Sequence, residues 1–124
     1  MTPIVYIVDD DVLVRKALRR LIHTMGYAAE TFSSALDFLN YPHQEQQSCL
    51  ILDVRMPGLS GLDLQKQLSA RDSAIPIIFV TAHDDDQVQA QALKAGALAF
   101  LIKPFDNQEL FDDVAAALHL GHSK

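Results

Sequence analysis

Asp53 is the residue in this chain best placed to do chemistry. It ends the apolar run Leu50-Ile51-Leu52, and the turn Pro57-Gly58 comes shortly after it. A carboxylate at the carboxyl end of a buried strand lies at the sheet edge where open α/β proteins bind their ligands. An ordinary surface aspartate that closes a strand fits this stretch alone equally well, so the rest of the chain has to decide.

Polar residues also end three other apolar runs. Asp9 and Asp10 follow Ile4 to Val8, Thr81 follows Ile75 to Val80, and Lys103 follows Ala99 to Ile102. If these runs are parallel strands, Asp9, Asp10 and Asp53 meet in one crevice at the topological switch point. Like charges at short range repel and favour a divalent cation between them. A set made of carboxylates favours Mg²⁺ over Zn²⁺.

Thr81 and Lys103 would face that cation from the opposite side of the crevice. A carboxylate, a metal, a hydroxyl and an ammonium around one point form a phosphoryl site, in which one carboxylate attacks phosphorus. Single members have simpler explanations: Asp11 fits the cap of the first helix better than a metal ligand. Their joint placement at one sheet edge nevertheless favours function over chance, with Asp53 as the reacting group.

Five apolar runs alternate with five helical patterns along the chain. The predicted strands are 4–8, 27–32, 49–52, 75–80 and 99–102, and the predicted helices are 14–25, 35–39, 62–68, 84–95 and 107–118. This order requires right-handed crossovers and predicts an α/β, flavodoxin-like (βα)5 fold. The fold is a doubly wound five-stranded parallel sheet of order 2-1-3-4-5, in three αβα layers. Residues 1–120 form one domain, and 121–124 form a short polar tail.

The first predicted helix carries several basic side chains, whereas the helix over 84–95 has little apolar surface. The first places Arg15, Lys16, Arg19 and Arg20 on its expected solvent side. The helix over 84–95 is rich in alanine and glutamine, with Val88, Ala92 and Leu93 as a modest apolar face. A helix with so little apolar surface should shift more easily than its neighbours.

The totals exclude several classes of protein. The chain of 124 residues carries 16 acidic and 10 basic residues, a net charge of −6 that opposes direct nucleic-acid binding. Cys49 is the only cysteine, so no intrachain disulfide forms, as in a reducing cytoplasm. The apolar run that begins at Ile4 is too short to cross a membrane and lacks a basic flank. We therefore expect a cytoplasmic domain with no membrane contact.

Four motifs together resemble the receiver domain of two-component response regulators. They are Val8-Asp9-Asp10-Asp11, Asp53-Val54-Arg55-Met56-Pro57-Gly58, Val80-Thr81-Ala82-His83 and Phe100-Leu101-Ile102-Lys103-Pro104-Phe105. The resemblance covers essentially the whole chain, and both the spacing and the order of the motifs match. The second and third motifs are similar to the FixJ-type subgroup of nitrogen-fixation regulators.

The resemblance implies a role for each matching residue. Asp53 corresponds to the phospho-acceptor, Asp10 to a direct Mg²⁺ ligand, and Asp9 to a ligand through water, with Mn²⁺ as a substitute ion. Arg55 occupies the position whose backbone carbonyl completes the metal site. Thr81 matches the switch hydroxyl, and Lys103 matches the lysine that pairs with the phosphoryl group and precedes a typically cis bond to Pro104.

Two further positions tune the switch in this family. Phe100 holds the switch aromatic position, and a phenylalanine there lacks the hydroxyl through which a tyrosine would signal. His83 stands two residues after Thr81, at a variable position that affects phosphoryl lifetime. Both residues are therefore expected to modulate signalling without taking part in phosphoryl transfer.

The function implied by the resemblance is a phosphorylation switch. Asp53 takes a phosphoryl group from a sensor histidine kinase or a small donor, and the domain catalyses only its own phosphorylation and dephosphorylation. The face made by helix 84–95, strand 99–102 and the last helix then changes and controls homodimerisation or an effector. The subgroup implies transcription regulation through a LuxR-type helix-turn-helix domain, which these residues do not contain.

Two alternative functions remain open from the sequence. A Mg²⁺-dependent phosphohydrolase of the haloacid-dehalogenase type would use Asp9-Asp10-Asp11 as its Asp-x-Asp motif. Such enzymes have threonine or valine where Leu13 stands, and they carry a cap that this chain lacks. A receiver-like module that signals without phosphate is the other alternative, and the acidic pair, Thr81 and Lys103 argue against it.

Overall fold

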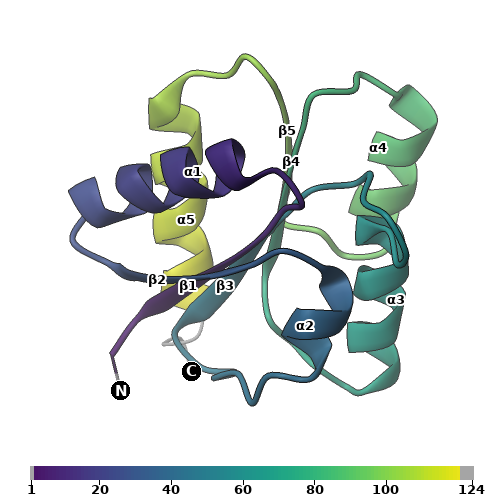
Figure 1. Ribbon diagram of the computed structural model, residues 1–124, viewed down its shortest axis with the longest axis horizontal. Helices are drawn as coiled ribbons and strands as arrows, with labels where there is room; N and C mark the ends of the chain where they lie inside the picture. Colours follow the sequence, from purple (N-terminus) through teal and green to yellow (C-terminus); the bar gives the residue numbers. More distant parts are fainter. Residues whose placement is uncertain (1, 121–124) are drawn as a thin grey trace.

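Five short segments form one parallel sheet in the computed structural model, which describes residues 2–120 (Figure 1). The strands are β1 (Ile4–Val8), β2 (Ala28–Phe32), β3 (Ser48–Leu52), β4 (Ile77–Thr81) and β5 (Ala99–Ile102). Their order is β2-β1-β3-β4-β5, and every neighbouring pair is parallel, which confirms the predicted topology. The central strands β3 and β4 are buried at every position, as strands covered on both faces must be.

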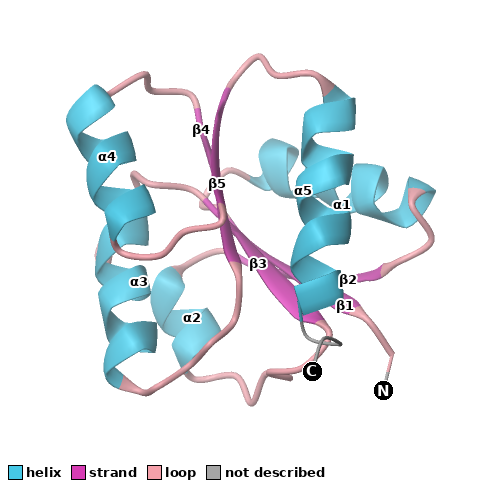
Figure 2. Ribbon diagram, turned by 180° about the vertical axis from the view of Figure 1, so that it is seen from behind, coloured by secondary structure: helices cyan, strands magenta, loops and turns pink. Residues whose placement is uncertain are grey.

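Helices cover both faces of the sheet and complete the three predicted layers. They are α1 (Val12–Thr24), α2 (Ala35–Leu39), α3 (Gly61–Ala70), α4 (Asp86–Lys94) and α5 (Asn107–Leu120). Figures 1 and 2 show α1 and α5 on one face, and α2, α3 and α4 on the other. The predicted tail 121–124 lies outside the described residues. Among the described residues, no helix is long and apolar enough to cross a membrane.

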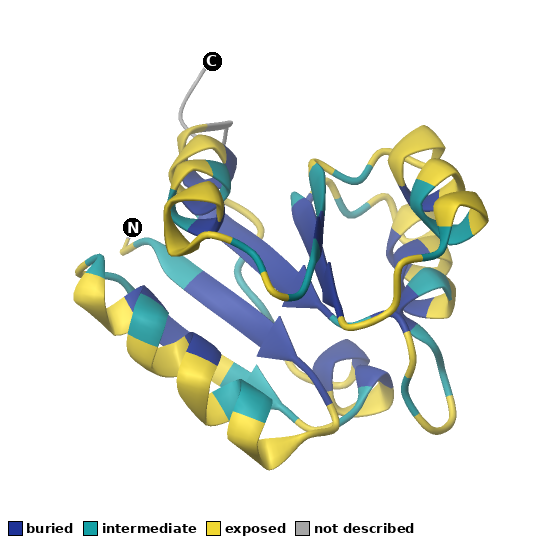
Figure 3. Cartoon of the chain, turned by 90° about the horizontal axis from the view of Figure 1, so that it is seen from above, coloured by how far each residue is buried: buried dark blue, intermediate teal, exposed yellow. Residues whose placement is uncertain are grey.

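The core is divided by the sheet into two apolar clusters. Val5 and Ile7 of β1 face the cluster beneath α1 and α5, whereas Tyr6 and Val8 face the cluster beneath α2, α3 and α4. This alternation follows from the two-residue period of a strand. Figure 3 shows the central strands buried and the outer helix surfaces exposed, so the site residues at the ends of these strands stand on a rigid scaffold.

Side-chain caps determine where the helices begin. The carboxylate of Asp11 accepts a hydrogen bond from the backbone N–H of Leu13 at 2.9 Å, so Asp11 caps α1 as predicted. Ser60 and Asp63 form a reciprocal capping box at the start of α3. Each cap satisfies N–H groups that would lack a partner within the first helical turn.

Some element boundaries differ from the predicted ones. Strand β4 begins at Ile77, after Pro76, because Pro76 has no N–H to donate to a neighbouring strand. Helix α3 begins at Gly61, which the sequence placed in the preceding turn.

Helix α4 is held by a narrower apolar face than the sequence suggested. Among the residues of α4, all of them described, Ala92 alone is buried, and Val88 is half-buried against the same core cluster. Leu93, predicted to share this face, is 43% exposed. The prediction for Leu93 was wrong because adjacent residues of a helix point about 100° apart and Ala92 already faces the sheet.

Candidate functional site

The carboxyl ends of β1 and β3 bring three carboxylates together. Asp9, Asp10 and Asp53 offer oxygen atoms that all lie within 4.8 Å of one another. Strands β1 and β3 are neighbours here, while the chain continues from β1 to β2 on the other side, so this is the switch point of the sheet. Asp9 is buried, Asp53 half-buried and Asp10 exposed, so the cluster opens toward solvent.

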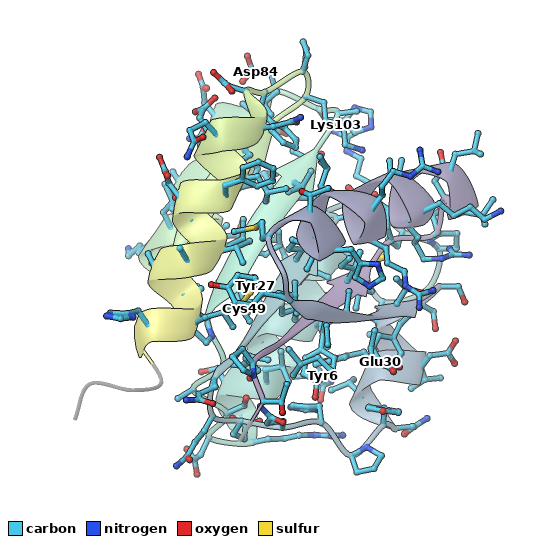
Figure 4. The ribbon with its side chains drawn as sticks, turned by 90° about the vertical axis from the view of Figure 1, so that its left-hand side faces the viewer. Tyr6, Tyr27, Glu30, Cys49, Asp84 and Lys103 are labelled. Atoms are coloured by element: carbon cyan, nitrogen blue, oxygen red, sulfur yellow. The ribbon has the colours of Figure 1, made fainter. Side chains whose placement is uncertain are left out.

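A cavity of about 270 Å³ at this edge joins the acidic cluster to residues from three further segments. Its walls are Asp9, Asp10, Asp11, Val14, Asp53, Arg55, Ala82, His83 and Lys103. Figure 4 shows Lys103 at the same end of the molecule as Asp84, which lies just before α4. The structure thus brings together six of the predicted site residues around one space: Asp9, Asp10, Asp53, Arg55, His83 and Lys103.

Asp9 is held in place from both its side chain and its backbone. Its Oδ1 accepts a hydrogen bond from the N–H of Asp11 at 2.8 Å, and its carbonyl oxygen accepts one from Nη1 of Arg15 at 2.7 Å. Only 3% of Asp9 is exposed, and this burial raises the pKa of its carboxyl. The Asp11 N–H and the charge of Lys103 act in the opposite direction.

Asp53 is a weaker acid than an ordinary aspartate. Burial is the largest cause that raises its pKa, and the charge of Asp9 comes next; together they bring it to about 6. The N–H of Val54 and the charge of Lys103 lower the pKa and offset part of this rise. That N–H donates to Oδ1 of Asp53 at 2.8 Å, while the N–H of Asp53 itself donates to the carbonyl of Val8 at 3.1 Å. Asp53 is therefore fixed to the end of β1 and still largely ionised above pH 7.

The donor set fits a hard divalent cation. Carboxylate oxygens are the preferred ligands of Mg²⁺ and Mn²⁺, whereas zinc sites in proteins contain histidine or cysteine ligands in most cases. The unfavourable charge of Asp9, Asp10 and Asp53, seen in the raised pKa of Asp53, is the imbalance that such a cation would relieve.

Thr81 occupies a different position from the other predicted site residues. It is fully buried at the end of β4 and is not among the residues that line the cavity. Its hydroxyl accepts a hydrogen bond from the N–H of His83 at 3.2 Å. The Thr81 hydroxyl thus contacts the loop after β4 in this structure.

Phe100 lies within β5, and Lys103 follows that strand and lines the crevice. The ring of Phe100 is half-buried, and its centroid lies 5.8 Å from that of Phe79 on β4. The N–H of Lys103 donates to the carbonyl of Thr81 at 2.8 Å, and the bond from Lys103 to Pro104 is cis, as the resemblance implied. The ends of β4 and β5 therefore share a backbone contact directly beside the site.

Two residues that support the site were not recognised from the sequence. A Cβ on Gly61 would overlap the carbonyl oxygen of Asp53 and lie 3.0 Å from a ring carbon of Phe79. Arg15, predicted to face solvent, is half-buried and contacts Asp9. The sequence carried no signal for either contact, because the partner in each case is a backbone carbonyl oxygen: that of Asp53 for Gly61 and that of Asp9 for Arg15.

A family model and individual known proteins are similar to this chain, and all of them belong to response regulators. A family model of the response regulator receiver domain matches residues 5–115. The response regulator protein TodT of Pseudomonas putida is 48% identical over 117 residues, which cover 94% of this chain and 52% of TodT. The transcriptional regulatory protein FixJ of Azorhizobium caulinodans is 40% identical over 114 residues, which cover 92% of this chain and 54% of FixJ.

A solved structure is similar in three dimensions as well. That of the response regulator StyR has a TM-score of 0.91 and 48% identity, covering 98% of this chain and 62% of the StyR chain. The chain thus spans about half the length of the curated relatives it matches.

Proposed function

The chain belongs to the response regulator receiver domain family, and from this premise we propose that it is a phosphorylation switch with Asp53 as phospho-acceptor. The observation that carries the proposal is the cluster of Asp9, Asp10 and Asp53 within 4.8 Å, in a crevice that Lys103 also lines. Membership of this family identifies the chain as a signalling domain. The roles given below to individual residues are our proposal.

The carboxylates would hold one Mg²⁺ ion, for which Mn²⁺ could substitute. Asp10 and Asp53 would be direct ligands, Asp9 would act through water, and the backbone carbonyl of Arg55 would complete the set. When bound, the ion would offset the negative charge of phosphoryl oxygens near Asp53.

Asp53 would be the nucleophile. One of its carboxylate oxygens forms a bond to phosphorus while the bond from phosphorus to the histidine nitrogen of a sensor kinase breaks, and the electron pair stays on that nitrogen. The ammonium of Lys103 donates to a phosphoryl oxygen and offsets its charge. A small donor such as acetyl phosphate would react in the same way.

The acyl phosphate on Asp53 would then change the structure around β4 and β5. The Thr81 hydroxyl would exchange its bond with His83 for one to a phosphoryl oxygen, and the side chain of Phe100 would move with it. The resulting change in the α4-β5-α5 surface would control a homodimer or an effector. His83, whose exposed side chain lines the cavity, would modulate how long the phosphoryl group persists.

Transcription regulation would be the output of this switch. FixJ is a transcriptional regulatory protein by name, and this chain matches about half of it. We propose that a helix-turn-helix domain outside these residues would bind DNA, since the net charge of −6 disfavours direct contact by this domain. The expected location is the cytoplasm, where a histidine kinase would present its phosphohistidine.

The direct test is transfer of radioactive phosphate from acetyl phosphate in the presence of Mg²⁺. The unaltered chain should acquire one alkali-labile phosphate, and Asp53→Asn should acquire none because an amide cannot form the acyl phosphate. Asp72→Asn is the matched control: Asp72 is exposed, and its positive φ of 57° is tolerated by asparagine. Labelling of Asp53→Asn at the rate of the unaltered chain would refute the acceptor assignment.

A further inference from the structure

Arg15 differs from the other basic residues of α1 in what it contacts. Its Nη1 donates to the carbonyl oxygen of Asp9 at 2.7 Å, and its side chain is half-buried. Arg19 and Arg20 on the same helix are exposed. A bond of this length from a guanidinium is a charge-assisted hydrogen bond, stronger than one between neutral groups.

The hydrogen bond from Arg15 holds the peptide unit that joins Asp9 to Asp10. The Asp9 carbonyl and the Asp10 nitrogen belong to one planar peptide, so fixing that carbonyl also fixes the backbone from which the Asp10 side chain extends. Asp9 Oδ1 accepts from the N–H of Asp11, which holds the next peptide of the same turn. Asp10 itself is exposed, so its direction depends on the backbone around it.

The positive charge of Arg15 should weaken cation binding, whereas its hydrogen bond to the Asp9 carbonyl should strengthen it. A guanidinium in contact with Asp9 is close to the carboxylate cluster, and its positive charge repels a divalent cation there. A role in geometry and a role in charge therefore predict changes of opposite sign when Arg15 is removed.

We propose that Arg15 is a positioning residue of the cation site: its bond to the Asp9 carbonyl orients the Asp9–Asp10 peptide so that the Asp10 carboxylate meets those of Asp9 and Asp53. This inference rests on the proposed function only in that it assumes the cluster binds a divalent cation. It concerns the arrangement of the ligands and not the transfer of phosphate.

The test compares Arg15→Met with Arg19→Met. Both variants remove one positive charge from α1, but only the first removes the bond to Asp9. Binding of Mn²⁺ is measured from the loss of the electron paramagnetic resonance signal of the free ion, with no phosphodonor present. Arg19→Met should bind Mn²⁺ as well as the unaltered chain or slightly better, and Arg15→Met should bind roughly tenfold more weakly, as expected for loss of a charged hydrogen bond.

A structural defect is separated from a positioning defect by two further measurements. Circular dichroism without cation establishes that Arg15→Met is folded under the binding conditions. Arg15→Lys keeps the positive charge and a hydrogen-bond donor, but the ammonium is placed differently from the guanidinium. This variant should therefore recover part of the Mn²⁺ affinity lost in Arg15→Met. If Arg15→Met does not fold, the comparison of Arg15→Lys with the unaltered chain decides, because only positioning predicts weaker binding at constant charge.

Two outcomes overturn the inference or its premise, and a third bears on the proposed phosphoryl transfer alone. Mn²⁺ binding by Arg15→Met equal to or tighter than binding by Arg19→Met would show that charge dominates. Absence of Mn²⁺ binding by the unaltered chain would overturn both the cation site and the role of Arg15. Normal cation binding without labelling of Asp53 would refute the proposed phosphoryl transfer and leave the role of Arg15 standing.

Discussion

Gln65 of α3 donates a hydrogen bond from Nε2 to the backbone carbonyl oxygen of Ala92 in α4, at 3.0 Å and away from solvent. Gln65 is 5% exposed and Ala92 is fully buried. The same carbonyl accepts a bond from the N–H of Ala97 at 3.0 Å, so the end of α4 is held at this point by two donors. One amide side chain therefore joins the helix that follows the Asp53 loop to the helix proposed to move in the switch.

Gln65→Met should loosen α4 without altering the rest of the fold. Methionine has a similar length and no donor, so the Ala92 carbonyl would lose one of its two partners at a cost of about 1 kcal/mol. Hydrogen exchange should become roughly fivefold faster at the amides of residues 92–97, whereas amides of α1 and α5 should be unaffected. Gln67→Met is the control because Gln67 lies exposed on the same helix. Equal exchange in the two variants would show that Gln65 does not hold α4.

Gly61→Ala should disturb Asp53 through the backbone. A Cβ at this position overlaps the Asp53 carbonyl oxygen, so the β3 end and the start of α3 must separate. We expect a loss of about 1–3 kcal/mol of stability, as for other overpacked sites, and slower labelling by acetyl phosphate. Thermal unfolding and labelling rates measure the two effects separately.

Gly58→Ala is the comparison for Gly61→Ala. Gly58 has a φ of +78° and no atom within 4 Å of a Cβ placed on it, so alanine would strain the loop without displacing Asp53. It should reduce stability by about 1 kcal/mol and leave the labelling rate near that of the unaltered chain. If Gly61→Ala were labelled as fast as Gly58→Ala, the close contact with Asp53 would have no role in the reaction.

The sequence contained enough information for the topology and the location of the site, because both depend on local patterns. Apolar runs such as Ile4 to Val8 predicted the strands, and their alternation with helices predicted a parallel sheet covered by helices on both faces. Polar residues at strand ends, such as Asp9 and Asp53, then had to share an edge. These inferences need no knowledge of which side chains touch.

The contacts of Arg15, Gln65 and Gly61 could not be predicted in the same way. In each case the partner is a backbone carbonyl: that of Asp9, Ala92 or Asp53. Every residue carries a carbonyl, so residue type gives no signal for such a contact, and only the assembled fold brings the groups together.

Asp53→Asn should stabilise the chain at neutral pH in the absence of divalent cations. The folded-state pKa of about 6 lies above the ordinary value of 3.8, so ionised Asp53 opposes folding above pH 6. The penalty is fully present above the folded pKa and disappears as the pH falls below 3.8. The variant should gain about 1–3 kcal/mol at pH 7.5, with allowance for the partial exposure of Asp53, and nothing at pH 3.5. Urea unfolding at several pH values measures the gain, and a gain independent of pH would contradict the assignment.

Mg²⁺ should stabilise the unaltered chain in a pH-dependent way, because the ion and the proton compete for Asp53. With a pKa of about 6, Asp53 is ionised at pH 8 and largely protonated at pH 5. Below pH 6 the apparent affinity should fall by about tenfold per pH unit, and the rise in melting temperature produced by Mg²⁺ should shrink with it. At a concentration ten times the Kd the ion adds about 1.4 kcal/mol at pH 8.

Asp53→Asn should lose most of this stabilisation at both pH values, whereas Asp72→Asn should retain it. An equal effect of Mg²⁺ on Asp53→Asn would mean that the ion binds elsewhere, since the amide cannot replace the charge of the carboxylate.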